Sequence, residues 1–209
     1  MMFEEQMLKS RFNSRIILSL LIVLSISFVL SLFVMQLAAG ILFVLWLFEK
    51  HDQRKKASDI ILKFIVVFGL VRLISIFLSE YPQSSYESFY KEGLFYTSAA
   101  VIPFYLKTLG KKSIQTLMLA FIIGAAVMSL VGSIRFFLND VERAQAFTSS
   151  YAVFSSYLLA SFSVALFYPK KIKSNIEILS WSLVYVIILM GIFTSLGRAN
   201  IAIALLILV

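Results

Sequence analysis

The chain of 209 residues contains no cysteine and only one histidine, His51. Disulfide bonds, thiolate metal sites and cysteine nucleophiles are therefore excluded. Charged residues are also scarce, at 14% of the chain, whereas about a quarter is usual in a soluble domain. Apolar residues take their place, with 60% hydrophobic residues and a mean hydropathy of +0.93. This composition excludes an ordinary soluble fold and a disordered chain. The net charge of +8 does not indicate nucleic-acid binding, because the apolar runs are too long.

The apolar segments predict an all-α fold, a polytopic transmembrane helical bundle, because a membrane helix needs about 20 mostly apolar residues. The first run, residues 16–48, would be about 50 Å long as one helix. We expect two spans with a turn near Ser27–Ser31, and one long helix is the alternative. Residues 1–209 form one transmembrane domain with about seven full spans and an incomplete eighth. The predicted spans are about 12–27, 32–48, 59–79, 93–106, 113–138, 150–168, 176–196 and 199–209.

The basic residues predict the orientation of this bundle. Short loops rich in Lys and Arg stay cytoplasmic, so the N-terminus and the segments 50–56, 107–112 and 170–173 are expected inside. All but five of the 19 lysines and arginines fall in inner segments or next to them. The five exceptions are Arg72, Lys91, Arg135, Arg143 and Arg198.

Four of these five exceptions are arginines, and a charge inside the membrane costs about 2.5–3.5 kcal/mol on insertion scales. Arginine binds phosphate through a planar fork of donors and stays charged when it is partly desolvated. The pattern therefore predicts binding of a lipid diphosphate by Arg143, Arg198, Arg135 and Arg72. The alternative is snorkelling and pairing with Glu80, Asp140 or Glu142. Arg72, the deepest, is alternatively a structural charge paired inside the bundle.

Three outer segments carry recognisable patterns. In the first, Pro82 is expected to end the preceding span, and Ser84 with Glu87 predicts the start of a short helix. The second, residues 143–158, reads Arg-Ala-Gln-Ala-Phe-Thr-Ser-Ser-Tyr-Ala-Val-Phe-Ser-Ser-Tyr-Leu, and its small residues suit close helix packing in lipid. The third, residues 194–200, reads Thr-Ser-Leu-Gly-Arg-Ala-Asn, where Gly197 predicts a tight turn.

These segments resemble those of the bacterial O-antigen ligase and O-antigen polymerase group. The segment at Arg143 is similar to the group's R-x-x-G-x-F/N loop, although Ala146 stands in place of the glycine. The segment at Arg198 is similar to its T/S-x-S/T-R-[GA] turn, although Gly197 stands where a hydroxyl residue often precedes the arginine. Residues 79–85 resemble its S-x-x-P-x-x-S loop. The resemblance covers the whole chain but only the N-terminal half of such a protein.

The resemblance implies a metal-independent glycosyltransferase of the bacterial cytoplasmic membrane that uses no cofactor. Such proteins take a glycan from an undecaprenyl-diphosphate carrier on the extracytoplasmic face. Ligases pass it to the lipid A core, and polymerases extend another carrier-linked chain. Diphosphate contacts are implied for Arg143 and Arg198.

The group's large outer loop, with its histidine, is expected beyond Val209. No catalytic residue is assigned to this chain, because His51 lies in an inner loop and no other good general base is evident. We interpret the chain as a fragment that is inactive by itself. Two other functions stay open from the residues: a transporter or flippase of an anionic or lipid-linked substrate, and a non-enzymatic membrane scaffold whose arginines pair with carboxylates.

Overall fold

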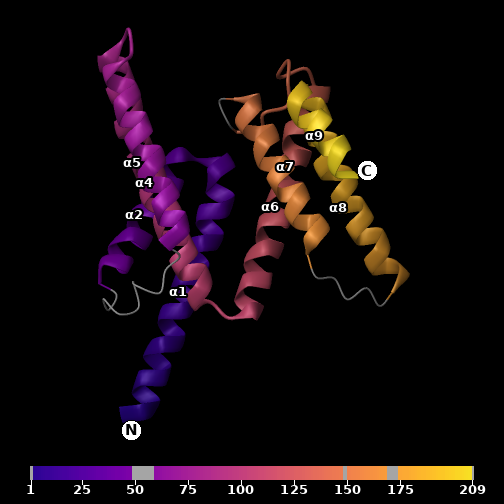
Figure 1. The fold of residues 1–209 in the computed structure, drawn as a ribbon. Coiled ribbons are helices and arrows are strands. Elements are labelled where there is room, and N and C mark those ends of the chain that lie inside the picture. Colours follow the sequence, from indigo (N-terminus) through magenta and orange to yellow (C-terminus); the bar gives the residue numbers. More distant parts are fainter. Residues whose placement is uncertain (1, 49–58, 148–149, 169–173, 209) are drawn as a thin grey trace. The chain divides into compact units, whose positions relative to one another are not determined.

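The computed structural model describes residues 2–48, 59–147, 150–168 and 174–208 (Figure 1). Every regular element in these ranges is an α-helix, which confirms the predicted all-α class. The helices are α1 (Met2–Leu30), α2 (Leu32–Leu47), α4 (Asp59–Phe77), α5 (Pro82–Thr108), α6 (Lys111–Phe137), α7 (Tyr151–Phe167), α8 (Asn175–Thr194) and α9 (Arg198–Leu208).

The helix boundaries lie close to the predicted segments, except that α1 begins at Met2 rather than near residue 12 and that the helices differ around Pro82. The break between α1 and α2 falls at Ser31, inside the expected turn. The short separate helix predicted from Ser84 and Glu87 is wrong, because α5 runs from Pro82 to Thr108 without interruption. Tyr81 is its N-cap residue, and Pro82 occupies the first turn. Proline is tolerated there because N–H groups in the first turn make no hydrogen bond within the helix. The span predicted at 93–106 is therefore part of a longer helix.

Among the described residues, two helices are long and apolar enough to cross a membrane: α6, with 27 residues, and α8, with 20. Four further apolar segments are shorter. In the part of the chain that the structure describes, the prediction of seven full spans is not confirmed. The shorter segments are Ser14–Leu30, Phe33–Leu47, Tyr151–Phe167 and Arg198–Ile207.

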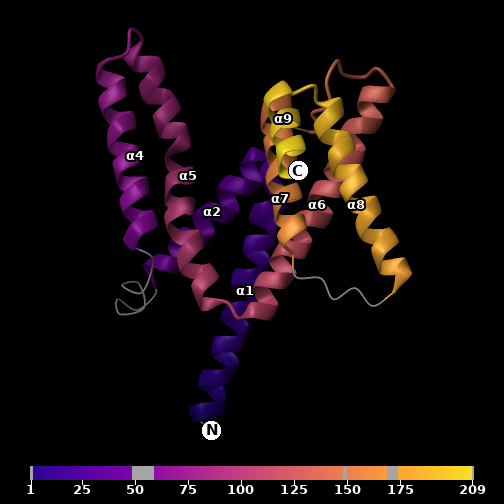
Figure 2. The ribbon, with the colours of Figure 1, turned by 45° about the vertical axis from the view of Figure 1, so that its right-hand side comes forward.

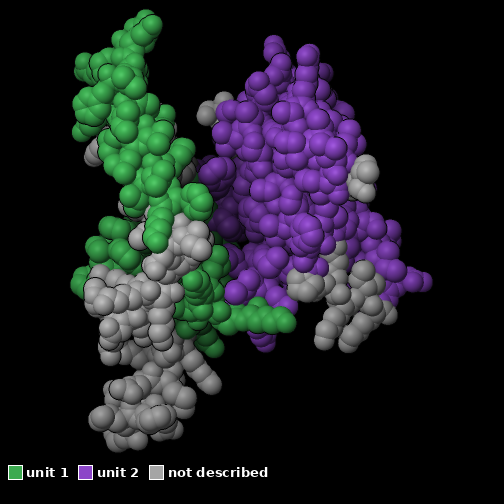
Figure 3. Space-filling view, in the orientation of Figure 1, with its two compact units in different colours: residues 1–24, 33–111 green, residues 25–32, 112–209 purple. Residues whose placement is uncertain are grey.

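The chain divides into two compact units (Figure 3). Unit 1 comprises residues 1–24 and 33–111, and unit 2 comprises residues 25–32 and 112–209. In unit 1, α4 lies along α5 (Figures 1 and 2). The Tyr105 hydroxyl of α5 donates a hydrogen bond to the Leu42 carbonyl oxygen of α2 at 3.5 Å, which ties these two helices together.

In unit 2, α7 packs against both α8 and α9. Its core is formed by large apolar side chains from α6, α7 and α8, including Ile122, Phe154, Leu158, Ile188 and Ile192. Small residues allow the helices to approach closely. A Cβ added at Gly191 of α8 would overlap Ser129 of α6 and lie 2.7 Å from Leu158 Cδ1 of α7.

Candidate functional site

Two segments that the sequence predicts to be outer lie at the same end of unit 2. In Figures 1 and 2, the connection from α6 to α7 and the turn from α8 to α9 are both at the top of the unit. The backbone N–H of Ala144 donates to the Thr194 carbonyl oxygen at 3.1 Å. The Asn200 side-chain amide donates to Ser155 Oγ at 2.6 Å. The structure therefore brings the loop that contains Arg143 together with residues 194–200, which we call the Arg198 turn.

The loop over residues 139–147, which we call the Arg143 loop, begins with a tight helix end. Asn139 is left-handed, with φ 60°. Its N–H donates to the Phe136 carbonyl at 3.1 Å, and the Asp140 N–H donates to the Arg135 carbonyl at 3.0 Å. This is the Schellman arrangement, in which asparagine is tolerated where glycine is most common. It reverses the chain so that the loop returns over the last turns of α6.

Ala146 anchors the other end of the loop. It is fully buried and left-handed, with φ 44°. Its carbonyl oxygen accepts a hydrogen bond from Nη1 of Arg135. A Cβ added at Gly132 would lie only 3.2 Å from the Ala146 nitrogen, so the loop rests directly on α6.

The turn between α8 and α9 differs from the sequence prediction. The left-handed residue is Leu196, with φ 54°, and no described glycine has a positive φ. Gly197 instead allows close packing against α7, because a Cβ there would lie 3.1 Å from Ser155 Oγ. Ser195 Oγ donates to the Ile192 carbonyl at 2.6 Å and accepts from the Gly197 N–H at 3.3 Å. Packing against α7, rather than a backbone conformation, explains the glycine.

Buried hydroxyl groups link the helices beneath these two segments. Ser133 Oγ of α6 lies 3.2 Å from Thr194 Oγ1 of α8, and both residues are buried. Ser129 of α6 donates to the Ile187 carbonyl of α8 one turn deeper. Hydroxyl groups of this kind act as interhelical ties in an apolar bundle. These small polar residues of α6 and α8 hold the two helices together below the Arg143 loop.

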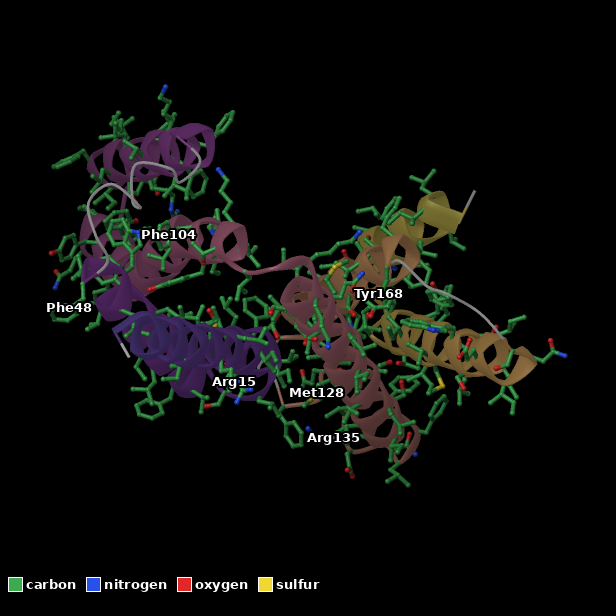
Figure 4. All side chains as sticks on the ribbon, turned by 90° about the horizontal axis from the view of Figure 1, so that it is seen from below. Arg15, Phe48, Phe104, Met128, Arg135 and Tyr168 are labelled. Carbon is green, nitrogen blue, oxygen red and sulfur yellow. The ribbon has the colours of Figure 1, made fainter. Side chains whose placement is uncertain are left out.

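The arginines differ in their surroundings. Arg143 is exposed, and its Cζ lies 4.4 Å from the ring centroid of Tyr151, in cation–π contact. Arg198 is exposed as the first residue of α9. Arg135 is half-buried in the last turn of α6, where Figure 4 labels it with Met128 of the same helix. Arg72 lies half-buried in α4, which belongs to unit 1.

No group of three or more histidine, aspartate or glutamate side chains gathers as a metal site among the described residues. His51 lies outside the described residues. A comparison with known proteins finds no family model, no curated protein and no solved structure that matches this chain. The geometry of this end of unit 2 and the sequence resemblance are therefore the grounds for a functional proposal.

Sequence reasoning missed three features of this site. It assigned no role to Thr194, whose carbonyl binds the loop, or to Ala146 as a strained anchor. It also did not distinguish Arg135 from the exposed arginines. The one available signal was Ala146 itself, since the resembling motif has glycine at this position and glycine adopts positive φ readily.

Proposed function

We propose that the chain belongs to a polytopic glycosyltransferase of the O-antigen ligase or polymerase type in the bacterial cytoplasmic membrane. Its donor is a glycan on undecaprenyl diphosphate, and its acceptor is the lipid A core or a growing glycan. Arg143 and Arg198 bind the diphosphate on the extracytoplasmic face. The observation that carries the proposal is the convergence of the Arg143 loop and the Arg198 turn at one end of unit 2, where the Ala144 N–H donates to the Thr194 carbonyl oxygen.

The membrane part of the proposal rests on α6 and α8. Only 17% of the most apolar stretch of α8 is buried within the protein. A soluble protein would place such a helix in its core, whereas a bilayer covers the exposed apolar side chains. The rings of Tyr168, Trp181 and Tyr185 make two successive tilted contacts, from the residue after α7 to the first half and the middle of α8. Tyr and Trp favour the membrane interface, so this cluster fits the inner boundary.

The anion-binding part of the proposal rests on electrostatics. The N-terminus of a helix has unpaired N–H groups and a partial positive charge, which favour an anion and disfavour a cation. Arg198 nevertheless stands at the first position of α9 and is exposed there. A bound phosphate group between this helix end and the guanidinium groups removes the conflict. The left-handed backbone of Ala146 also matches the glycine of the resembling motif.

The proposed reaction is attack by an acceptor hydroxyl on the anomeric carbon of the donor sugar. A new glycosidic C–O bond forms, the bond to the diphosphate breaks, and the hydroxyl proton passes to a general base. Negative charge grows on the leaving diphosphate. Fixed guanidinium groups then stabilise the transition state more than the bound donor.

Substitution of the two exposed arginines in the complete protein tests the proposal. We expect Arg143→Gln and Arg198→Gln each to abolish glycan transfer from a purified undecaprenyl-diphosphate donor, with normal membrane insertion. Lys112→Gln, at the other end of α6, removes the same charge and should keep full transfer. Wild-type transfer by both arginine variants would contradict diphosphate binding here. Uptake of a soluble anion into proteoliposomes without glycan transfer would support a transporter instead.

A further inference from the structure

We propose that Arg135 is a positioning residue that holds the Arg143 loop in shape and is not itself an anion ligand. Its relation to substrate binding rests on the proposed function. Its effect on the loop does not, since that effect depends only on contacts within unit 2.

The first step is the bond that Arg135 makes. It lies in the last turn of α6, and its Nη1 donates to the carbonyl oxygen of Ala146, eleven residues along the chain. The guanidinium is half-buried, unlike the exposed side chains of Arg143 and Arg198. A hydrogen bond from a charged donor is stronger than a neutral one, and more so where solvent is partly excluded. The planar fork is thus directed at the protein backbone.

The second step is the strain at the acceptor. Ala146 has φ 44°, a conformation that a residue with a Cβ adopts at a cost. It is buried against α6, above Gly132. The loop must therefore be held in this conformation by contacts, and the bond from Arg135 reaches the strained residue itself.

The third step connects this anchor to Arg143. Ala144 follows Arg143 directly, and its N–H donates a hydrogen bond to the Thr194 carbonyl oxygen at 3.1 Å, which fixes its position. Arg143 thus lies between two fixed points, the Asn139 helix end and the segment Ala144–Ala146. Its guanidinium is placed 4.4 Å from the Tyr151 ring centroid. Loss of the Arg135 bond frees one of these fixed points and lets the position of Arg143 vary.

This arrangement makes a prediction that a ligand role does not share. If Arg135 acts by holding Ala146, then Ala146→Gly should compensate for its loss, because glycine adopts positive φ at little cost. If Arg135 binds an anion directly, a glycine eleven residues away restores nothing. The double variant therefore separates the two roles.

The absence of cysteine makes a direct test possible. Glu142 is exposed next to Arg143, and Glu142→Cys in the full chain accepts a single nitroxide spin label. We expect Arg135→Gln to raise the ratio of mobile to immobile label about tenfold, which corresponds to losing a charge-assisted hydrogen bond. Adding Ala146→Gly should lower this ratio about threefold. Arg135→Lys should lie between the parent and Arg135→Gln, and Lys112→Gln should match the parent.

Diphosphate affinity is measured on the same variants with inorganic diphosphate as the probe. Arg135→Gln should weaken binding and Ala146→Gly should restore part of it, whereas Ala146→Gly should not restore binding to Arg143→Gln. Unchanged label mobility in Arg135→Gln overturns the positioning role, whatever the affinity. If Ala146→Gly lowers the label mobility of Arg135→Gln but the parent protein does not bind diphosphate, the positioning role stands and the proposed function is contradicted. If Arg135→Gln does not fold, Arg135→Lys with and without Ala146→Gly provides the same comparison.

Discussion

The guanidinium of Arg135 donates a hydrogen bond to the carbonyl oxygen of Ala146, whose backbone is left-handed at φ 44°. This pair joins the last turn of α6 to the loop that leads into α7. A charged donor thus stabilises a backbone conformation that alanine does not favour by itself. The loop's shape follows from tertiary contacts, and this has consequences that can be measured.

Replacing Ala146 by glycine should stabilise the protein. Glycine removes the cost of the positive φ but gains freedom in the unfolded chain, so we expect a net gain of about 0.5–1 kcal/mol. Ala160→Gly is the matched control, because Ala160 is exposed in the middle of α7. It should cost about 1 kcal/mol. Thermal unfolding in detergent, followed by circular dichroism, measures both, and equal losses of stability would contradict the strain at Ala146.

Gly191→Ala should destabilise unit 2. The added methyl group would overlap Ser129 and lie 2.7 Å from Leu158 Cδ1, so α6, α7 and α8 must separate. Overpacking of this kind costs about 1–3 kcal/mol. The change should lower the midpoint of thermal unfolding measured in detergent.

Gly40→Ala is the matched control for this packing prediction. Gly40 lies within α2, and no atom lies within 4 Å of the position of an added Cβ. Alanine should therefore raise stability by about 0.5–1 kcal/mol through its helix propensity. If Gly40→Ala lowers stability as much as Gly191→Ala does, the loss at position 191 does not come from crowding between α6 and α8.

The hydroxyl pair Ser133 and Thr194 should contribute a small coupling energy. Their oxygens lie 3.2 Å apart, and Thr194 also donates to the Met190 carbonyl at 2.8 Å. Interhelical hydrogen bonds in membrane proteins average about 0.6 kcal/mol. A double-mutant cycle with Ser133→Ala and Thr194→Val should give a coupling of about this size. Strictly additive losses would mean that the two hydroxyls do not interact.

The helices follow closely from the sequence because long apolar runs determine where they lie. The segment predicted at 113–138 is α6 at Lys111–Phe137, and that at 59–79 is α4 at Asp59–Phe77. Pro82 misled the prediction because proline both breaks a helix and suits its first turn. The predicted short helix and the span at 93–106 consequently merged into α5.

The site follows less completely from the sequence. Arg143 and Arg198 were singled out by residue type and by the side of the membrane, and the structure places their segments in contact. Alanine and leucine have no preference for positive φ, so residue type does not predict Ala146 or Leu196 as turn residues, and only the glycine of the resembling motif points to position 146. Residue type also cannot show that Arg135 binds the backbone, because that bond depends on the returning loop.

The ends of α6 should lie on opposite sides of the membrane. Its 27 residues span about 40 Å, whereas the hydrocarbon core is about 30 Å thick. Lys112 is exposed in the first turn of α6 and Glu142 is exposed in the loop after its last turn, and each can be replaced by cysteine in a chain that otherwise has none. In intact bacterial spheroplasts, a membrane-impermeant maleimide should label Glu142→Cys and not Lys112→Cys, and lysis should expose both. The reverse pattern would contradict the proposed orientation, and labelling of both before lysis would contradict a membrane-spanning α6.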